Sequence, residues 1–166
     1  AEAVPLPRRS HGSASNPTTS VLYVFGGFTL AKDSPAGKNF NDVWEFNPTT
    51  RKWKQLAEYR RPGAPQGRGA MAMAFDPGYG DGSLIIHGGA TCLTGCTCHS
   101  DLFRFDLSTR QWSTIQTKSF GPVGRHEMSS LSLSSLLLHT GDGAPGVDLR
   151  GSPTAQGKTG FPLLLP

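Results

Sequence analysis

Three cysteines and one histidine, the residues in this chain best suited to chemistry, lie within eight positions of one another. They are Cys92, Cys96, Cys98 and His99. Thiolate and imidazole groups are the usual ligands of Zn²⁺, which is held by four groups that converge tetrahedrally. The same cysteines are compatible with one disulfide plus a free thiol, or with three reduced thiols in an exposed loop. The spacing leaves these three alternatives open.

Arginines that recur at similar intervals are a second candidate set. Arg9 begins RSHGSA, Arg68 lies in PQGRGAM and Arg125 lies in PVGRHEM. A guanidinium offers five N–H donors, which suit a carboxylate or phosphate on a ligand or partner. A repeated position is also typical of a structural role, in which those donors bond to backbone carbonyls. Both interpretations are kept for Arg9, Arg68 and Arg125.

Other motifs do not form a catalytic site. GSPTAQGKT at 151–159 approximates a phosphate-binding loop, but five residues rather than four separate its glycine from GKT, and one of them is proline. The five histidines are spread along the chain, and Asn16 and Asn47 each precede a proline, which excludes N-glycosylation there. We therefore predict no catalytic residues and a protein that is not an enzyme.

The chain repeats itself. DVWEFNPTTRKW at 42–53 aligns with DLFRFDLSTRQW at 101–112 at one constant offset, and each is preceded by an apolar run that ends in paired glycines. Short apolar or alternating runs at 43–46, 71–75 and 84–87 predict strands, and no helical periodicity extends beyond a couple of turns. Because single units of such repeats cannot bury their own apolar face, they stack on one another. The pattern predicts an all-β fold.

This arrangement resembles the kelch repeat. The resemblance implies blades, each a four-stranded antiparallel sheet, set around a central channel, with the glycine pair ending the second strand and the tryptophan on the fourth. Phenylalanine replaces the tyrosine that is usual in the family, and ThrGlyAsp at 140–142 stands where a third glycine pair is expected. The residues that carry the resemblance are Gly26, Gly27, Phe46, Trp53, Gly88, Gly89, Phe105 and Trp112.

The repeats predict a kelch region over residues 1–141. It consists of one blade at 7–56, a second at 65–116 and part of a third at 122–141. Residues 142–166 lack tryptophan and tyrosine, and we predict that they form a disordered tail. Propellers usually have four to eight blades. We therefore expect an incomplete propeller, and hypothesise that the chain is a truncated or partial form of a longer protein.

Charge and hydropathy argue against two classes of partner. The 16 basic and 12 acidic residues give a net charge of +4. The basic residues are scattered rather than arranged in a stripe with aromatics, so nucleic-acid binding is not expected. LSLSSLLL at 131–138 is too short and polar to span a bilayer. Clustered cysteines without glycosylation sites favour the cytoplasm.

Two functions follow from different classes. Segments 29–40 and 90–100 both follow a glycine pair yet differ completely in sequence, and variation on a repeated frame is typical of binding loops. We predict a scaffold or adaptor without a cofactor that binds a protein partner there, using Lys32, Asp33, Lys38 and the recurrent arginines. Self-association through exposed blade edges is a further expectation. The alternative is a metal-dependent or catalytic propeller in which the cluster at 92–99 holds zinc.

Overall fold

The computed structural model describes residues 3–29, 38–92 and 96–116, and these residues form strands and no helix. The predicted all-β class is therefore confirmed. Over the same residues there is no helix that could cross a membrane.

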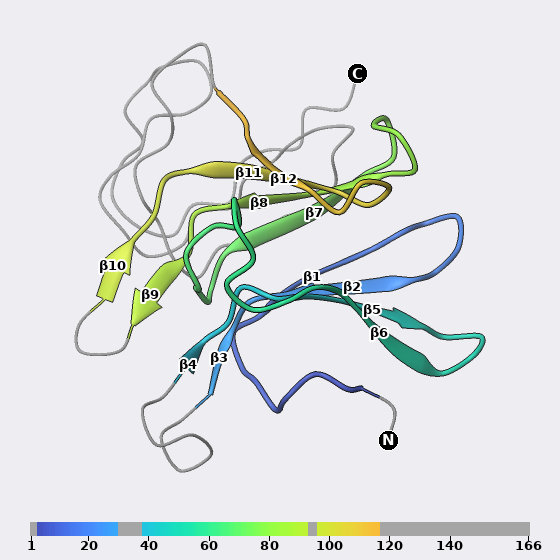
Figure 1. The fold of residues 1–166 in the computed structure, drawn as a ribbon, viewed down its shortest axis with the longest axis horizontal. Helices are drawn as coiled ribbons and strands as arrows, with labels where there is room; N and C mark the ends of the chain where they lie inside the picture. The colour runs from blue at the N-terminus through green and yellow to red at the C-terminus, as the bar shows by residue number, and fades with distance from the viewer. Residues whose placement is uncertain (1–2, 30–37, 93–95, 117–166) are drawn as a thin grey trace, which may run out of the picture.

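Two four-stranded antiparallel sheets form the body of the molecule (Figure 1). We call them the first and second blades. The first contains, in spatial order, β1 (Gly12–Ser15), β2 (Leu22–Phe25), β5 (Val43–Asn47) and β6 (Lys52–Ala57). The second contains β7 (Ala72–Asp76), β8 (Ser83–His87), β11 (Leu102–Asp106) and β12 (Trp112–Thr114). The sheets have the topology that the kelch resemblance implies, with each glycine pair at the end of the second strand and each repeat tryptophan on the fourth.

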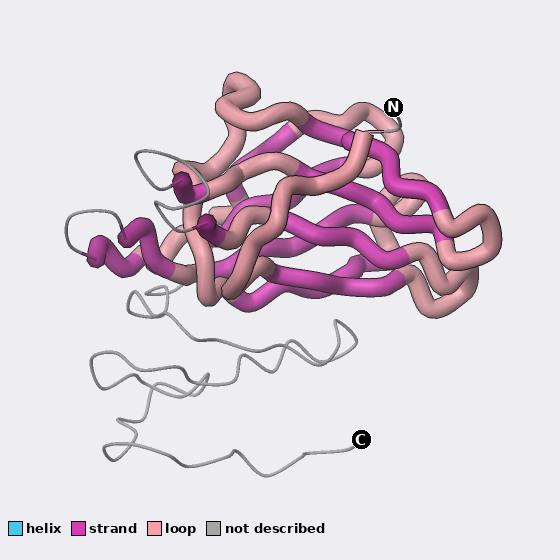
Figure 2. The backbone as a smooth tube through the Cα atoms, turned by 90° about the horizontal axis from the view of Figure 1, so that it is seen from below, coloured by secondary structure: helices cyan, strands magenta, loops and turns pink. Residues whose placement is uncertain are grey.

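Each blade carries a short hairpin between its second and third main strands. In the first blade β3 (Phe28–Thr29) pairs with β4 (Lys38–Asn39). In the second blade β9 (Ala90–Cys92) pairs with β10 (Cys96–Cys98). Both hairpins lie at the same end of the molecule, on the left of Figure 1, and Figure 2 shows them extending beyond the sheets. The divergent segments predicted at 29–40 and 90–100 correspond to these hairpins, except that β3 begins one residue earlier, at Phe28.

The turns between the outer strands are alike in both blades. The side chain of Asn47 accepts hydrogen bonds from the backbone N–H groups of Thr49 and Thr50, at 2.9 and 3.1 Å. Asp106 does the same with the two N–H groups at equivalent positions, both at 2.8 Å. Asn and Asp favour such turns because their side chains satisfy backbone donors that the turn leaves unpaired. The repeated polar turns therefore have a specific physical cause.

The apolar core lies between the two blades. Side chains alternate along a strand, so Tyr23 and Phe25 both point from β2 toward the second blade. The Tyr23 ring stacks on Phe75 at 5.9 Å, and Phe25 meets Trp112 edge to face at 5.2 Å. Aromatic pairs in these arrangements stabilise a core beyond the area that they bury. The core consists of Tyr23, Phe25, Val43, Leu56, Ala57, Met71, Met73, Leu84, Ile86 and Phe105.

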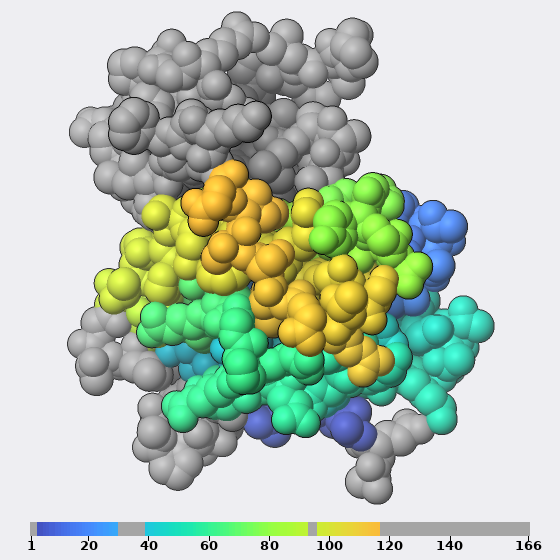
Figure 3. All heavy atoms as spheres, turned by 45° about the horizontal axis from the view of Figure 1, so that its top comes forward, coloured from blue at the N-terminus to red at the C-terminus, as the bar shows by residue number. Residues whose placement is uncertain are grey.

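The segment between β6 and β7 joins the blades and runs past β12, where it is the green band beside the orange strand in Figure 3. Asn41 holds this segment, because its side-chain amide donates to the Pro65 carbonyl at 2.9 Å and accepts from the Arg60 N–H at 2.8 Å. The strands lie within the predicted blades 7–56 and 65–116, except that β6 ends at Ala57. The partial blade predicted at 122–141 and the tail predicted at 142–166 lie outside the described residues.

Candidate functional site

Arg68 is the most completely buried charged side chain among the described residues, with 1% of its surface exposed. Its guanidinium forms a bidentate pair with Asp101, in which the Nη2–Oδ2 distance is 2.9 Å. It also donates to the carbonyls of Gly88 and Gln66, each at 3.0 Å. These contacts join the end of β8 to the start of β11. The donors of Arg68 are therefore used within its own blade.

The first blade contains the same arrangement, built on Arg8. Arg8 donates to both carboxylate oxygens of Asp42, at 2.7 and 2.9 Å. It also donates to the carbonyls of Gly26 and Leu6, each at 3.1 Å. Each contact has its counterpart around Arg68. We call the two arrangements the arginine clamps, Arg8 with Asp42 and Arg68 with Asp101.

The structure shows that the equivalent of Arg68 in the first blade is Arg8, and not Arg9 as the sequence suggested. Arg9 was matched to Arg68, but Arg9 occupies the position of Gly69: Arg9 forms an isolated bridge with Phe28, just as Gly69 does with Ala90. Arg9 is exposed, and its guanidinium lies 4.6 Å from the centre of the Phe28 ring. Of the predicted set, Arg9 is thus available to a partner and Arg68 is enclosed, while Arg125 lies outside the described residues.

The second glycine of each pair permits close backbone contact. A Cβ on Gly27 would lie 2.7 Å from the Arg9 carbonyl oxygen, and one on Gly89 would lie 2.7 Å from that of Gly69. Both glycines have φ of +86°, which side chains disfavour. Gly27 also donates its N–H to the Arg68 carbonyl at 2.8 Å, which ties the first blade to the second. The glycines therefore allow the close backbone packing at the point where each hairpin begins.

Asn39 joins the two hairpins. Its side-chain amide donates to the Cys92 carbonyl at 3.3 Å and accepts from the Cys92 N–H at 3.4 Å. The side chain of Asn39 thus pairs with the edge of β9 as a neighbouring strand would. Asn39 could not be identified from the sequence, because a contact between positions 39 and 92 has no local signal. The two hairpins form one continuous surface, which we call the hairpin end.

His99 follows β10 and lies at the position of Phe40 in the first blade. The His99 N–H donates to the Gly89 carbonyl at 2.9 Å, as the Phe40 N–H does to the Gly27 carbonyl at 2.8 Å. Burial, followed by the nearby Arg68 charge, lowers the pKa of His99 below its ordinary value of 6.5, and Asp101 opposes this shift.

The pairing of His99 with Thr91 does not activate a nucleophile. The Thr91 hydroxyl donates its one proton to the Gly67 carbonyl at 2.7 Å. It must therefore accept from the His99 Nε2–H, which lies 2.8 Å away. A general base would have to accept that proton rather than donate one. The geometry assigns this pair to holding the hairpin.

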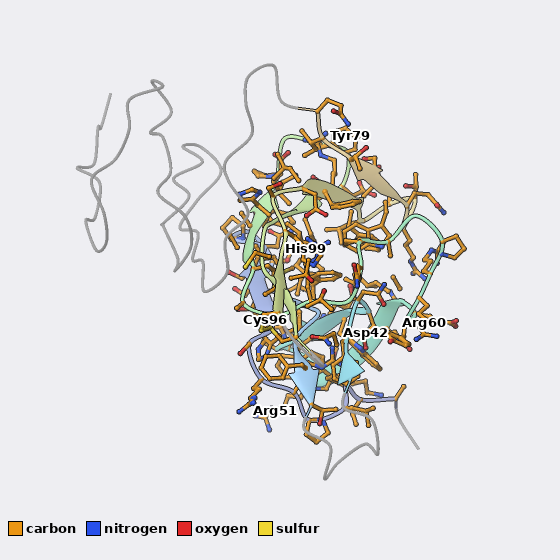
Figure 4. All side chains as sticks on the ribbon, turned by 90° about the vertical axis from the view of Figure 1, so that its left-hand side faces the viewer. Asp42, Arg51, Arg60, Tyr79, Cys96 and His99 are labelled. Atoms are coloured by element: carbon orange, nitrogen blue, oxygen red, sulfur yellow. A yellow bond between two sulfur atoms is a disulfide. The ribbon has the colours of Figure 1, made fainter. Side chains whose placement is uncertain are left out.

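The cysteines are divided between a disulfide and a free thiol. Cys92 and Cys96 are disulfide-bonded, whereas Cys98 is free and exposed. Figure 4 shows Cys96 farther out on the hairpin than His99. Across the described residues, no three His, Cys, Asp or Glu side chains are grouped so as to hold a metal ion. The four predicted ligands Cys92, Cys96, Cys98 and His99 are thus not brought together as a metal centre; two of them are used in the disulfide.

Of the remaining predicted binding residues, one lies in the part of the chain that the structure describes. Lys38 lies in β4 at the hairpin end, whereas Lys32 and Asp33 lie outside the described residues. A shallow hollow lined in part by Asn47, Thr50 and Trp53 lies at the β5–β6 turn, at the other end of the first blade from the hairpins. The structure therefore places Arg9, Lys38 and the cysteine hairpin at one end and this hollow at the other.

Comparison with known proteins identifies a family model that matches most of the chain and relatives that match part of it. Residues 1–142 match the family model described as the KLHDC2/KLHL20/DRC7 Kelch-repeats domain. Kelch domain-containing protein 10 of Xenopus tropicalis is 37% identical over 103 residues, which are 61% of this chain and 21% of that protein. Human Kelch domain-containing protein 3 is 26% identical over 88 residues, which are 53% of this chain and 20% of that protein. The chain thus spans about a fifth of the length of these relatives.

Proposed function

The chain belongs to the kelch-repeat family, whose members are generally protein-interaction modules without catalytic activity. On this premise we propose that it binds a partner protein through the hairpin end. The hairpin end consists of β3–β4 and β9–β10, together with Arg9 and His99, which flank them. The blades serve as the frame that presents this surface.

The observation that carries the proposal is the contrast between a repeated frame and unlike hairpins. The arginine clamps, the glycine φ angles and the outer turns agree between the blades almost contact for contact. In the hairpins, by contrast, Phe28 is replaced by Ala90 and Phe40 by His99, and the disulfide is found in the second alone. Loops that vary on a rigid scaffold commonly carry binding specificity. The hairpin end is where these blades differ most.

The exposed groups at the hairpin end indicate the chemistry of the partner surface. Arg9 presents an exposed guanidinium above the Phe28 ring, which suits a carboxylate or an aromatic face. Cys96, Thr97 and Cys98 are all exposed along β10. The partner would therefore meet a mixed polar and cationic surface, which is typical of the rim of a protein interface.

Site-specific photo-cross-linking tests this proposal. A photoreactive amino acid is placed at Thr97 on β10, and in a separate protein at Ser113 on β12 as the matched control. Both positions are exposed, but they lie on different parts of the second blade. We expect a discrete cross-linked protein from Thr97 and none from Ser113. Cross-links to the same protein from Ser113, or none from Thr97, would contradict the assignment.

Further expectations belong with this proposal. The outer edge strands β6 and β12 are the candidates for self-association, because an unpaired edge can pair with another chain. Sedimentation at increasing protein concentration measures it. We also propose a cytoplasmic location. A further proposal is that the chain is related to a longer kelch protein, which is supported by its covering only about a fifth of the length of each relative.

The metal-dependent alternative remains a separate hypothesis with its own measurement. It requires Cys92 and Cys96 as thiolates, so it applies to the reduced protein. Elemental analysis of protein purified under reducing conditions tests it. Stoichiometric zinc that is lost in a Cys98→Ser variant would favour the metal site over the plain binding surface.

A further inference from the structure

All three cysteines of the described chain lie on one face of the β9–β10 hairpin. Cys92 and Cys96 are direct cross-strand partners, so their side chains share a face. Cys98 lies two residues beyond Cys96 on the same strand and therefore points to that face as well. The face is exposed at both Cys96 and Cys98. The hairpin thus presents a disulfide near its tip and a free thiol beside it, both open to solvent.

The intact hairpin does not favour exchange of the disulfide to Cys98. Cys92 and Cys98 are diagonal neighbours, and such pairs lie about 7–8 Å apart, beyond the usual reach of a disulfide. Cys96 and Cys98 are two residues apart along a strand, about 6.8 Å, which is at the limit of that reach. The pairing of Cys92 with Cys96 is therefore the one that the hairpin supports, and Cys98 is left as a free thiol.

The disulfide lies at the junction between the hairpins. The backbone of Cys92 carries both hydrogen bonds to Asn39, which connects β9 to the hairpin of the first blade. The β9–β10 hairpin has three residues in each strand, and few backbone hydrogen bonds are available to hold so short a pair. The cross-link consequently holds both the hairpin and the backbone group that Asn39 recognises.

We infer that the Cys92–Cys96 disulfide is a reducible latch that controls the order of the hairpin end. A dithiol reductant opens it: one thiolate attacks a sulfur of the disulfide and forms a mixed disulfide, and the second thiol then displaces the protein sulfur. The reductant leaves as its own disulfide, and Cys92 and Cys96 remain as two thiols. In the cytoplasm proposed above, which is reducing, the latch rests open and binding is in its weaker state; oxidation closes the latch.

The latch has a consequence for binding, which rests on the function proposed above. A closed hairpin presents β10 in one conformation, so a partner that recognises it does not have to order it. Opening the latch loosens β10 and releases the Asn39 contact. Reduction should therefore weaken binding at the hairpin end and leave the frame of the blades intact.

Amide hydrogen exchange tests the latch without a partner. Exchange is followed in the full chain for peptides covering residues 83–87 and 90–99, before and after treatment with dithiothreitol. For a cross-link that closes a separation of four residues, the chain-entropy model predicts roughly twentyfold faster exchange in the hairpin on reduction. The β8 peptide should be unchanged. Equal exchange in the hairpin before and after reduction would overturn the latch.

Two variants separate the latch from general damage. Cys98→Ser retains the disulfide and should respond to reduction as the wild type does. The double variant Cys92→Ser with Cys96→Ser should exchange rapidly with or without reductant, while its β8 peptide stays protected. Alkylation that labels three thiols in protein kept under air, or a Cys98→Ser variant that no longer responds, would overturn the assignment of the disulfide.

The Thr97 cross-link, measured before and after reduction, tests the consequence for binding. We expect its yield to fall on reduction in the wild type and to be low throughout in the double variant. Faster exchange with an unchanged yield would overturn the control of binding. No cross-link in either state would contradict the proposed function instead, and the exchange data would still decide whether the latch exists.

Discussion

The two blades place equivalent residues in different surroundings. Trp112 lies between the blades, where it meets Phe25 of the first blade at 5.2 Å and Phe105 of its own at 4.9 Å. Trp53, at the same repeat position, meets Phe46 of its own blade at 5.0 Å. The tryptophan therefore belongs to the repeat, but its energetic role depends on the neighbour that a blade has on that face.

The positions of Phe40 and His99 show the same contrast at the hairpin end. In the first blade the Arg8 guanidinium lies 4.1 Å from the centre of the Phe40 ring, a favourable cation–π contact. In the second blade the Arg68 charge lies near an imidazole instead and disfavours its protonation. The difference between Phe40 and His99 at this equivalent position thus replaces a cation–π contact with a titratable imidazole beside an arginine.

The arginine clamps should give the largest effects on stability. Arg8→Ala removes the counter-ion of the Asp42 carboxylate, which keeps a hydrogen bond from the Trp44 indole N–H but has only 7% of its side chain exposed, and should lower the free energy of unfolding by about 3–5 kcal/mol. Arg68→Ala should cost less, about 2–3 kcal/mol, because the Asp101 side chain is 37% exposed and water can solvate it. Chemical denaturation measures both.

Arg9→Ala is the control for the clamps. Arg9 is exposed, and its contact with Phe28 should contribute less than about 1 kcal/mol. A cost for Arg9→Ala equal to that for Arg8→Ala would show that the correspondence between Arg8 and Arg68 is wrong.

The next largest effect should be a difference in stability between Trp112→Ala and Trp53→Ala. Trp112→Ala removes a ring that both blades contact, and we expect a loss of about 3 kcal/mol in the free energy of unfolding. Trp53→Ala should cost about half as much, because its ring contacts Phe46 of the same blade. Equal costs, measured by denaturant unfolding under the same conditions, would mean that the contact between the blades adds nothing.

The glycines should give a smaller but selective effect. Gly89→Ala adds a positive-φ penalty of about 1–2 kcal/mol and a clash with the Gly69 carbonyl oxygen. Gly63→Ala is a matched control, since Gly63 has φ of +79° but the nearest atom to its added Cβ is 3.8 Å away. The difference between the losses in unfolding free energy of the two variants therefore measures the cost of the clash between the Gly89→Ala side chain and the Gly69 carbonyl oxygen. No difference would contradict the role assigned to the glycine pair.

The smallest effect should be on pH dependence at the hairpin end. The folded pKa of His99 lies below 6.5, so its contribution to stability is present above pH 6.5 and is lost as pH falls through the folded pKa. As pH falls through that range, hydrogen exchange of residues 90–99 should become faster, after correction for the intrinsic pH dependence of exchange. His99→Phe, which copies the first blade, should remove the acceleration. A variant that still shows it would assign the effect to another group.

Local patterns predicted the frame well. The glycine pairs, the turns at Asn47 and Asp106 and the strand tryptophans depend on residues close in sequence, where side-chain type constrains backbone conformation directly. Two divergent segments were also correctly located between the second and third main strands.

Contacts between distant positions could not be obtained in this way. Arg9 was aligned to Arg68 because RSHGSA at 9–14 resembles the element that contains Arg68 and Arg125, whereas the backbone matches Ser10, with φ of +54°, to Ala70, with φ of +55°. Asn39 has no repeat partner that would have singled it out, and its bond to Cys92 exists because both hairpins extend from the same end. The choice of Cys92 with Cys96 likewise depends on the register of β9 and β10.

The central claim is that the repeated frame provides stability and the unlike hairpins provide binding. The most direct test is the yield of the Thr97 cross-link per folded molecule in two backgrounds, Arg68→Lys and Asn39→Ala. Arg68→Lys breaks the bidentate clamp and should lower the thermal midpoint while the yield stays unchanged. Asn39→Ala should lower the yield with a smaller change in midpoint. A lost cross-link in folded Arg68→Lys protein, with full yield in Asn39→Ala, would contradict the account.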